Sequence, residues 1–129
     1  PLPEGATALV YSRGSVPATT LGMIQKGMTS VTAASKTTYT AVANDQIVVD
    51  TAANVVTITL PATPAVGDEV TIMDGSATGG FATNNCVVAR NGSNIEGAAS
   101  DDNLTVNNQC VTLIYANATK GWLYKSTNQ

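Results

Sequence analysis

Few side chains in the sequence have the type and spacing that chemistry requires. The chain contains no histidine, which excludes Ser-His-Asp and Cys-His catalysis and histidine-ligated metal sites. Two adjacent acidic pairs remain, Asp68 with Glu69 and Asp101 with Asp102. Neighbouring side chains of a strand point to opposite faces, so Asp68 and Glu69 are not expected to converge on a substrate. We therefore predict that the protein is not an enzyme.

The second acidic pair is followed by Asn103 in an expected loop. Its carboxylate and backbone oxygens could bind a hard cation, but the loop lacks the spaced acidic ligands of a calcium site. A solvated turn is the favoured interpretation, and no metal or other cofactor is expected.

Cys86 and Cys110 lie in apolar, strand-like runs and lack the CxxC spacing of a metal site. Small cores use cysteine as a compact hydrophobe, so we expect free buried thiols. A disulfide between them is the alternative, although nothing in the sequence indicates an oxidising compartment.

Three residues in and after a glycine-rich stretch are candidate ligand contacts. Phe81 is the lone aromatic residue of residues 76–84, and Asn84 and Asn85 stand at the end of this stretch. An exposed aromatic ring can stack on a sugar, which would make this loop a carbohydrate- or receptor-binding surface. The alternative interpretation is that Phe81 plugs the end of a sheet.

The composition is that of one small domain with little charge. A chain of 129 residues has room for one hydrophobic core. Charged residues make up 12% of the chain, against about 25% in a typical soluble domain. The 6 Lys and Arg residues against 9 Asp and Glu give a net charge of −3, so no nucleic-acid partner is expected. No apolar run approaches the ~20 residues of a membrane span, so no membrane partner is expected.

Residues 36–129 read as short strands separated by turn signals, a pattern typical of all-β sandwiches and small barrels. In residues 55–60 apolar and Thr side chains alternate, and Pro61 ends the run because it has no N–H to donate. The dipeptide Asn91–Gly92 between two β-like runs predicts a hairpin with a type I′ turn. We predict an all-β fold, a small antiparallel β-sandwich or barrel-like knob.

Residues 1–35 mix Pro, Gly, Ser and Thr with isolated apolar groups and keep no period of 2 or 3.6 residues. They are too apolar for a disordered tail, so we predict an extended N-terminal attachment arm ahead of the knob. The alternative is an edge strand and a loop on the chain's own domain. The candidate partner contacts of the arm are Leu9, Val10, Tyr11, Leu21, Met23 and Ile24.

Four motifs carry a family resemblance: ITLP at 58–61, GDEVTIMDG at 67–75, NNCVVARNGSNIEG at 84–97 and VTLIY at 111–115. With them the chain resembles small β-domains of tailed-bacteriophage surface proteins. Such domains occur at the tips of tail fibres and as stand-alone knobs on phage heads, and the resemblance implies a homotrimer.

A short arm followed by one knob is the build of a capsid decoration, or cement, protein. The expected function is therefore a trimer on the virion surface whose arm binds the major capsid protein and stabilises the head. The competing hypothesis is a tail-fibre or short-fibre tip, attached to a tail or collar protein, that contacts host polysaccharide through Phe81, Asn84 and Asn85. A carbohydrate-binding module without a virion is the third.

Overall fold

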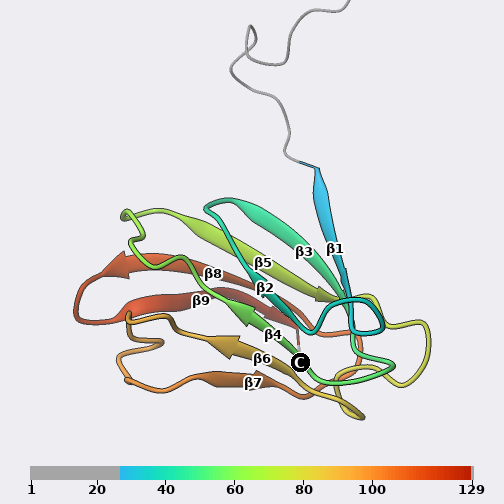
Figure 1. Ribbon diagram of the computed structural model, residues 1–129. Helices are drawn as coiled ribbons and strands as arrows, with labels where there is room; N and C mark the ends of the chain where they lie inside the picture. The colour runs from blue at the N-terminus through green and yellow to red at the C-terminus, as the bar shows by residue number, and fades with distance from the viewer. Residues whose placement is uncertain (1–26, 129) are drawn as a thin grey trace, which may run out of the picture.

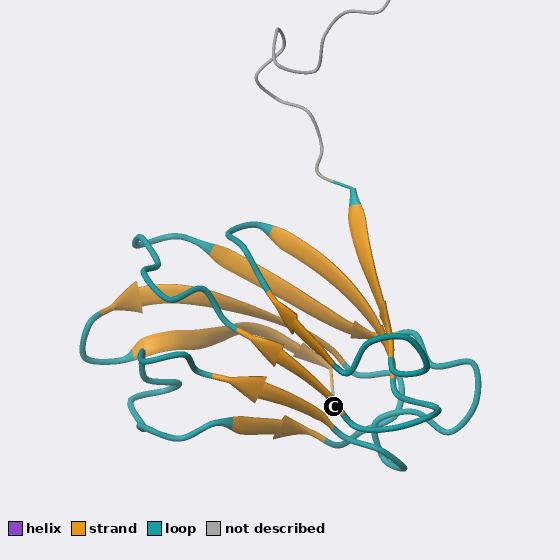
Figure 2. Ribbon diagram, in the orientation of Figure 1, coloured by secondary structure: helices purple, strands orange, loops and turns teal. Residues whose placement is uncertain are grey.

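The computed structural model describes residues 27–128, and every regular element among them is a β-strand (Figure 1). The all-β expectation is therefore confirmed. No helix in this part of the chain is long and apolar enough to cross a membrane. The strands, joined by loops and turns (Figure 2), are β1 (Met28–Thr32), β2 (Thr38–Thr40), β3 (Asp45–Asp50), β4 (Val56–Thr59), β5 (Glu69–Asp74), β6 (Cys86–Ala89), β7 (Asp102–Leu104), β8 (Cys110–Asn117) and β9 (Gly121–Asn128).

The strands belong to two sheets. One has the order β1-β3-β5-β8-β9 and the other the order β2-β4-β6-β7. From β1 to β6, consecutive strands alternate between the sheets, so that neighbours within a sheet are never consecutive in the chain. β1 and β2 are the first strands in the order of their sheets and β9 and β7 the last; Figure 1 shows β1 at the upper right of the molecule and β7 at the bottom.

The expectation of an antiparallel fold is wrong for much of the structure. The pairs β1–β3, β3–β5, β2–β4 and β4–β6 are parallel, and the pairs β5–β8, β6–β7 and β8–β9 are antiparallel. A parallel pair needs a connection that returns the chain to the same end, which is usually a helix. Here the returning element is a strand of the other sheet.

Both sheets contribute to one cluster of buried apolar side chains. Val56, Ile58 and Leu60, which the alternating pattern places on one face, are all fully buried. Trp122 and Phe81 are the largest fully buried side chains of the described residues. The two sheets therefore share a single hydrophobic core.

Strand pairing begins inside the segment that the sequence assigns to an arm. β1 pairs with β3 from Met28 opposite Gln46 to Thr32 opposite Asp50, and Val31 is only 1% exposed. Part of the sequence before residue 36 is thus built into a sheet. The candidate arm contacts lie outside the described residues; they are Leu9, Val10, Tyr11, Leu21, Met23 and Ile24.

The turn at Asn91–Gly92 forms, but the predicted hairpin around it is wrong. Both residues have positive φ, 51° and 94°, and the Ser93 N–H donates to the Arg90 carbonyl across 3.3 Å. The Asn91 side-chain amide donates to the Leu60 carbonyl at 2.9 Å. The chain leaves this turn without pairing along β6, whose partners are β4 and β7.

Both cysteines are free thiols, Cys86 buried and Cys110 half-buried. Burial, with a smaller contribution from the charge of Asp74, raises the pKa of Cys86 to about 12. Cys86 is therefore a neutral core residue at physiological pH, as the sequence predicts.

Asp74 at the end of β5 ties three segments together. Its carboxylate accepts the backbone N–H groups of Ser76, Phe81 and Asn108 at 3.0, 3.1 and 3.0 Å. Burial opposes its ionisation, but hydrogen bonds from the Ser76 side chain and from the three N–H groups outweigh burial and lower its pKa below 3.8. The carboxylate thereby holds the Phe81 loop and the turn before β8 against the end of the core.

Asp74→Asn should lower the free energy of unfolding at pH 7 by about 1–3 kcal/mol, because an amide nitrogen would replace one of the two accepting oxygens. The pKa of Asp74 is lower in the folded than in the unfolded chain, so the ionised group stabilises the fold above about pH 4. That contribution is lost as the pH falls through the folded-state pKa, and the variant and the parent should then converge. Urea unfolding from pH 2 to pH 7 measures the difference.

The matched control is Asp50→Asn, which alters a carboxylate that accepts the Ala52 N–H at 2.8 Å in an exposed turn. Its effect should be smaller than that of Asp74→Asn. An equal loss from the two variants would contradict the role of Asp74.

Candidate functional site

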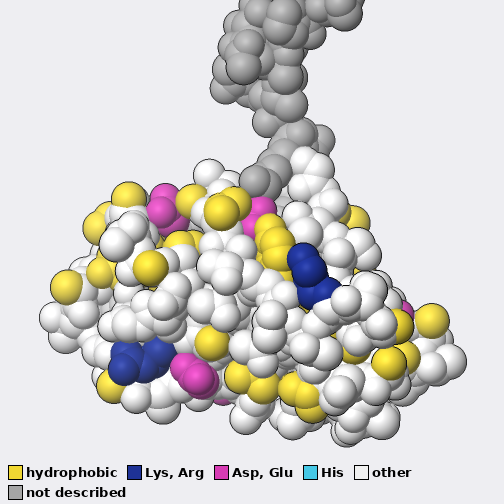
Figure 3. All heavy atoms as spheres, in the orientation of Figure 1, with side chains coloured by type: hydrophobic (Ala, Val, Ile, Leu, Met, Phe, Trp, Pro, Cys, Tyr) yellow, Lys and Arg dark blue, Asp and Glu magenta, His cyan; other side chains and the backbone are white. Residues whose placement is uncertain are grey.

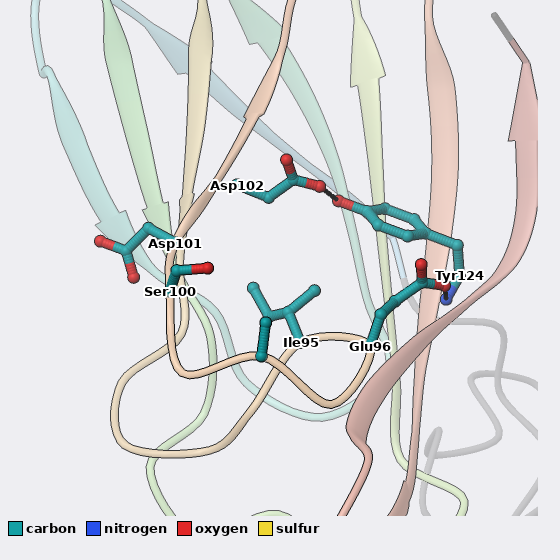
Figure 4. A pocket seen from close by; sticks show the side chains of 7 residues that line it. Ile95, Glu96, Ser100, Asp101, Asp102 and Tyr124 are labelled. Atoms are coloured by element: carbon teal, nitrogen blue, oxygen red, sulfur yellow. Dashed lines mark hydrogen bonds between the residues drawn. The ribbon is translucent and has the colours of Figure 1, made fainter.

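A pocket of about 200 Å³ lies at the side of the molecule where the two sheets end in β7 and β9 (Figure 4). β7 contributes Asp102, β9 contributes Tyr124, and the chain between β6 and β7 contributes the rest of the lining. The complete lining is Ile95, Glu96, Ala98, Ser100, Asp101, Asp102 and Tyr124.

A two-residue turn holds one wall of this pocket. Ile95 and Ala98 exchange both backbone hydrogen bonds at 2.9 Å, and the residues between them, Glu96 and Gly97, have φ of 51° and 83°. Two successive positive φ values define the tight type I′ geometry that fits a β-connection. The turn fixes the Glu96 side chain at the edge of the pocket.

The same turn is attached to the edge of β9. The Trp122 N–H donates to the Asn94 carbonyl at 2.8 Å, and the Trp122 carbonyl accepts the Glu96 N–H at 2.7 Å. Gly121, with φ of 71°, allows this close approach, because a Cβ there would overlap the backbone of Asn94. The pocket wall therefore depends on a glycine that no short motif reveals.

Tyr124 and Asp102 join the two sheets across the pocket. The Tyr124 hydroxyl donates to the Asp102 carboxylate, and Figure 4 shows the two side chains pointing toward each other. Burial, and then the hydrogen bond and charge of Asp102, raise the pKa of Tyr124 above its ordinary value of 10. Tyr124 is thus a stable donor at neutral pH rather than an acid–base group.

The other carboxylates of the pocket also accept hydrogen bonds from the protein. Asp101 accepts the Arg90 N–H at 2.9 Å, and Glu96 accepts the Tyr124 N–H at 3.4 Å. Ionised carboxylates are acceptors only, so the pocket suits hydroxyl or ammonium groups and repels phosphate. The described residues include no group of three or more acidic, Cys or His side chains that could hold a metal ion.

The loop residues selected from the sequence do not join this pocket. Phe81 is fully buried, so the expectation of an exposed aromatic contact is wrong, and the ring plugs the core as in the alternative interpretation. Asn84 donates its amide to the Thr51 carbonyl at 2.9 Å. The Asn85 carbonyl accepts the Val56 N–H at 3.3 Å. Both asparagines are half-buried and serve the loop itself.

The sequence analysis singles out two of the pocket residues, Asp101 and Asp102, and interprets them as a solvated turn. It does not single out Tyr124. Tyr124 packs against the core, and its hydroxyl reaches β7 of the other sheet. Only the pairing of β9 with β8, at the edge opposite β1, creates this contact.

Comparison of the sequence with protein-family models and with curated proteins finds no match. Support for a function therefore comes from the residues and contacts of the chain itself.

Gly121→Ala should lower the free energy of unfolding by about 3–5 kcal/mol, because the new Cβ would force the Asn94 backbone away from β9. The matched control is Gly92→Ala. Gly92 also has positive φ, but a Cβ there meets no atom within 4 Å. This control should cost only the conformational term of about 1–2 kcal/mol. Urea unfolding measures both, and equal losses would contradict the close-contact explanation.

Proposed function

We propose that this chain is a non-enzymatic structural protein on the surface of a tailed-bacteriophage virion, and specifically a trimeric capsid decoration protein. Its N-terminal segment, residues 1–26, binds the major capsid protein, and the knob, which begins with β1, faces solvent. The resemblance of four of its motifs to those of phage surface domains supports this proposal. We further propose that the knob is a two-sheet β-sandwich, supported by the core that both sheets share.

The observation that carries the proposal is the position of β1, the first described strand, relative to the pocket. Residues 1–26 lead directly into β1, at one edge of the five-stranded sheet. The pocket lies at the opposite edge, between β7 and β9. A chain anchored through its N-terminal segment would therefore present the pocket side away from its anchor.

The use of the acidic side chains supports a non-enzymatic role. Asp102 and Asp74 accept hydrogen bonds that hold strands and loops together. Asp68 accepts the Ala65 N–H at 2.8 Å, and Glu69 forms an ion pair with Lys125 at 2.9 Å. Asp68 and Glu69 thus have separate structural partners.

The surface also suits a particle exterior. On the face drawn in Figure 3, positive and negative side chains form small separate groups on a largely uncharged surface. A decoration protein stabilises a shell by mass action, since it binds the assembled shell and adds contact area across neighbouring capsomers. A chain with few charged residues and a net charge of −3 would interfere little with this attachment.

The proposal is tested by mixing the full chain with mature capsids that lack tails and decoration protein, sedimenting them and counting bound copies. We expect saturation at a multiple of three copies per particle. Leu9→Asp with Tyr11→Asp should abolish binding, because buried charge would disrupt an apolar contact. The control, Ala77→Asp with Thr78→Asp, adds the same charge to exposed knob positions and should bind normally. Absence of binding by the full chain would reject the decoration role.

The pocket favours a second candidate function, the receptor-binding tip of a tail or short fibre. Three carboxylates on the side opposite β1 could accept hydrogen bonds from the hydroxyl or amino groups of a host polysaccharide. The fibre-tip hypothesis then places the ligand at this pocket instead of at the Phe81 loop.

A glycan array probed with the full chain tests this second function. If it is correct, Glu96→Gln with Asp101→Asn should weaken binding of the selected glycan at least about tenfold, since charged hydrogen bonds are worth roughly 1.5–3 kcal/mol. Asp50→Asn, away from the pocket lining, is the control. Unchanged binding by the pocket variant would reject the site.

A further inference from the structure

The outer edge of β9 is covered by another segment of the described chain, whereas the outer edges of β1 and β2 are not. On the β9 side, residues 94–97 run along the strand edge, where the Asn94 carbonyl accepts the Trp122 N–H at 2.8 Å and the Lys120 carbonyl accepts the Gly97 N–H at 2.9 Å. The Glu96 carboxylate accepts the Tyr124 N–H at 3.4 Å. This edge of the five-stranded sheet is therefore covered by the chain's own loop.

On the opposite side, β1 and β2 are the outer strands of their sheets. The Ala33 N–H donates to the Asp50 carbonyl of β3. Backbone N–H groups alternate in direction along a strand, so those of Ser30 and Thr32 point away from β3. On β2, the Ala41 N–H donates to the Thr59 carbonyl. By the same alternation, the N–H groups of Thr38 and Thr40 point away from β4.

The edges of β1 and β2 lack the devices that usually protect an outer strand. Natural proteins protect such edges with charged side chains, proline, bulges or a covering segment. β1 has the sequence MTSVT and β2 the sequence TYT, with no charge, proline or register shift. Met28 and Val42, near the starts of β1 and β3, are 61% and 52% exposed. Within residues 27–128, no further strand pairs with this side.

We propose that residues 1–26 of the same chain cover this open side, with their backbone carbonyls accepting the outward N–H groups of β1 and β2. This segment enters the fold at β1, the outer strand of the five-stranded sheet. The chain uses residues 28–44 to add one strand to each sheet, β1 and β2, before β3 begins. Residues 1–26 are a longer stretch and include two apolar groups, 8–11 and 21–24.

The inference concerns the free chain in solution, so it stands or fails independently of the proposed function. The segment is the preferred occupant because its attachment to β1 gives it a high effective concentration at this side. A second copy of the chain is the alternative occupant, and the experiment distinguishes the two by concentration.

Amide hydrogen exchange of the full chain, resolved by NMR, tests the proposal. The amides of Ser30, Thr32, Thr38 and Thr40 should exchange at least about 100-fold more slowly than the exposed Ala99 amide, at a rate independent of protein concentration. The Trp122 amide is the internal reference for a covered edge. Exchange of the four amides as fast as that of Ala99 would overturn the proposal.

A pair of variants in the full chain identifies the occupant. Leu21→Asp with Ile24→Asp should restore fast exchange at the four amides and leave the Trp122 amide protected. Thr19→Asp with Thr20→Asp adds the same charge to polar positions of the same segment and should preserve protection. Protection that survives the first variant, or that rises with protein concentration, would assign the edge to another occupant and reject the proposal.

Discussion

The alternation of consecutive strands between two sheets is the constraint on which the rest of the structure depends. Because β1, β3 and β5 are separated by strands of the other sheet, each returns to its sheet in the same direction, and the pairs are parallel. Each connection from β1 to β6 passes from one sheet to the other, so the buried faces of both sheets are built together. Parallel sheets are usually covered on both faces and contain continuous apolar runs. Here one face of each sheet remains outside the core, and β3 and β4 alternate between buried and half-buried residues.

Where the shared core ends, hydrogen bonds between the sheets replace apolar contact. On one side the Tyr39 hydroxyl of β2 donates to the Asp45 carboxylate of β3 at 2.9 Å. On the other side Tyr124 of β9 donates to Asp102 of β7. In both pairs the tyrosine and the aspartate belong to different sheets. A tyrosine can do this because its ring packs on the core while its hydroxyl reaches a polar partner. The pocket beside Tyr124 thus lies where the hydrogen bond between Tyr124 and Asp102 connects the two sheets.

The sequence predicted what local patterns determine and missed what depends on distant pairing. The alternation that buries Val56, Ile58 and Leu60 is a local property, and so is the positive φ of Asn91. The same alternation occurs in parallel and antiparallel strands and does not specify which strand lies alongside. The antiparallel prediction therefore had no support from the pattern itself. The pocket also depends on strand pairing. Asp102 and Tyr124 meet because β7 pairs with β6 and β9 pairs with β8, and the sequence does not identify these partners. The burial of Phe81 is one of the two interpretations that the sequence leaves open. The Asp74 carboxylate accepts N–H groups from the Phe81 loop and from the turn before β8, and these two segments are far apart in the sequence.

The two sides of the molecule differ because the strand pairs are parallel on the β1 side and antiparallel on the β9 side. On the C-terminal side the chain reverses: β7 is antiparallel to β6, and β8 is antiparallel to β5. The reversal brings β9 to the edge, where the turn at Glu96 and Gly97 covers it. On the N-terminal side there is no reversal, and both edge strands retain the direction in which another pair could be added. The β1 and β2 side presents backbone groups of two outer strands, whereas the opposite side presents a pocket lined by three carboxylates. The two sides of the molecule therefore differ in their backbone edges because of strand order and direction.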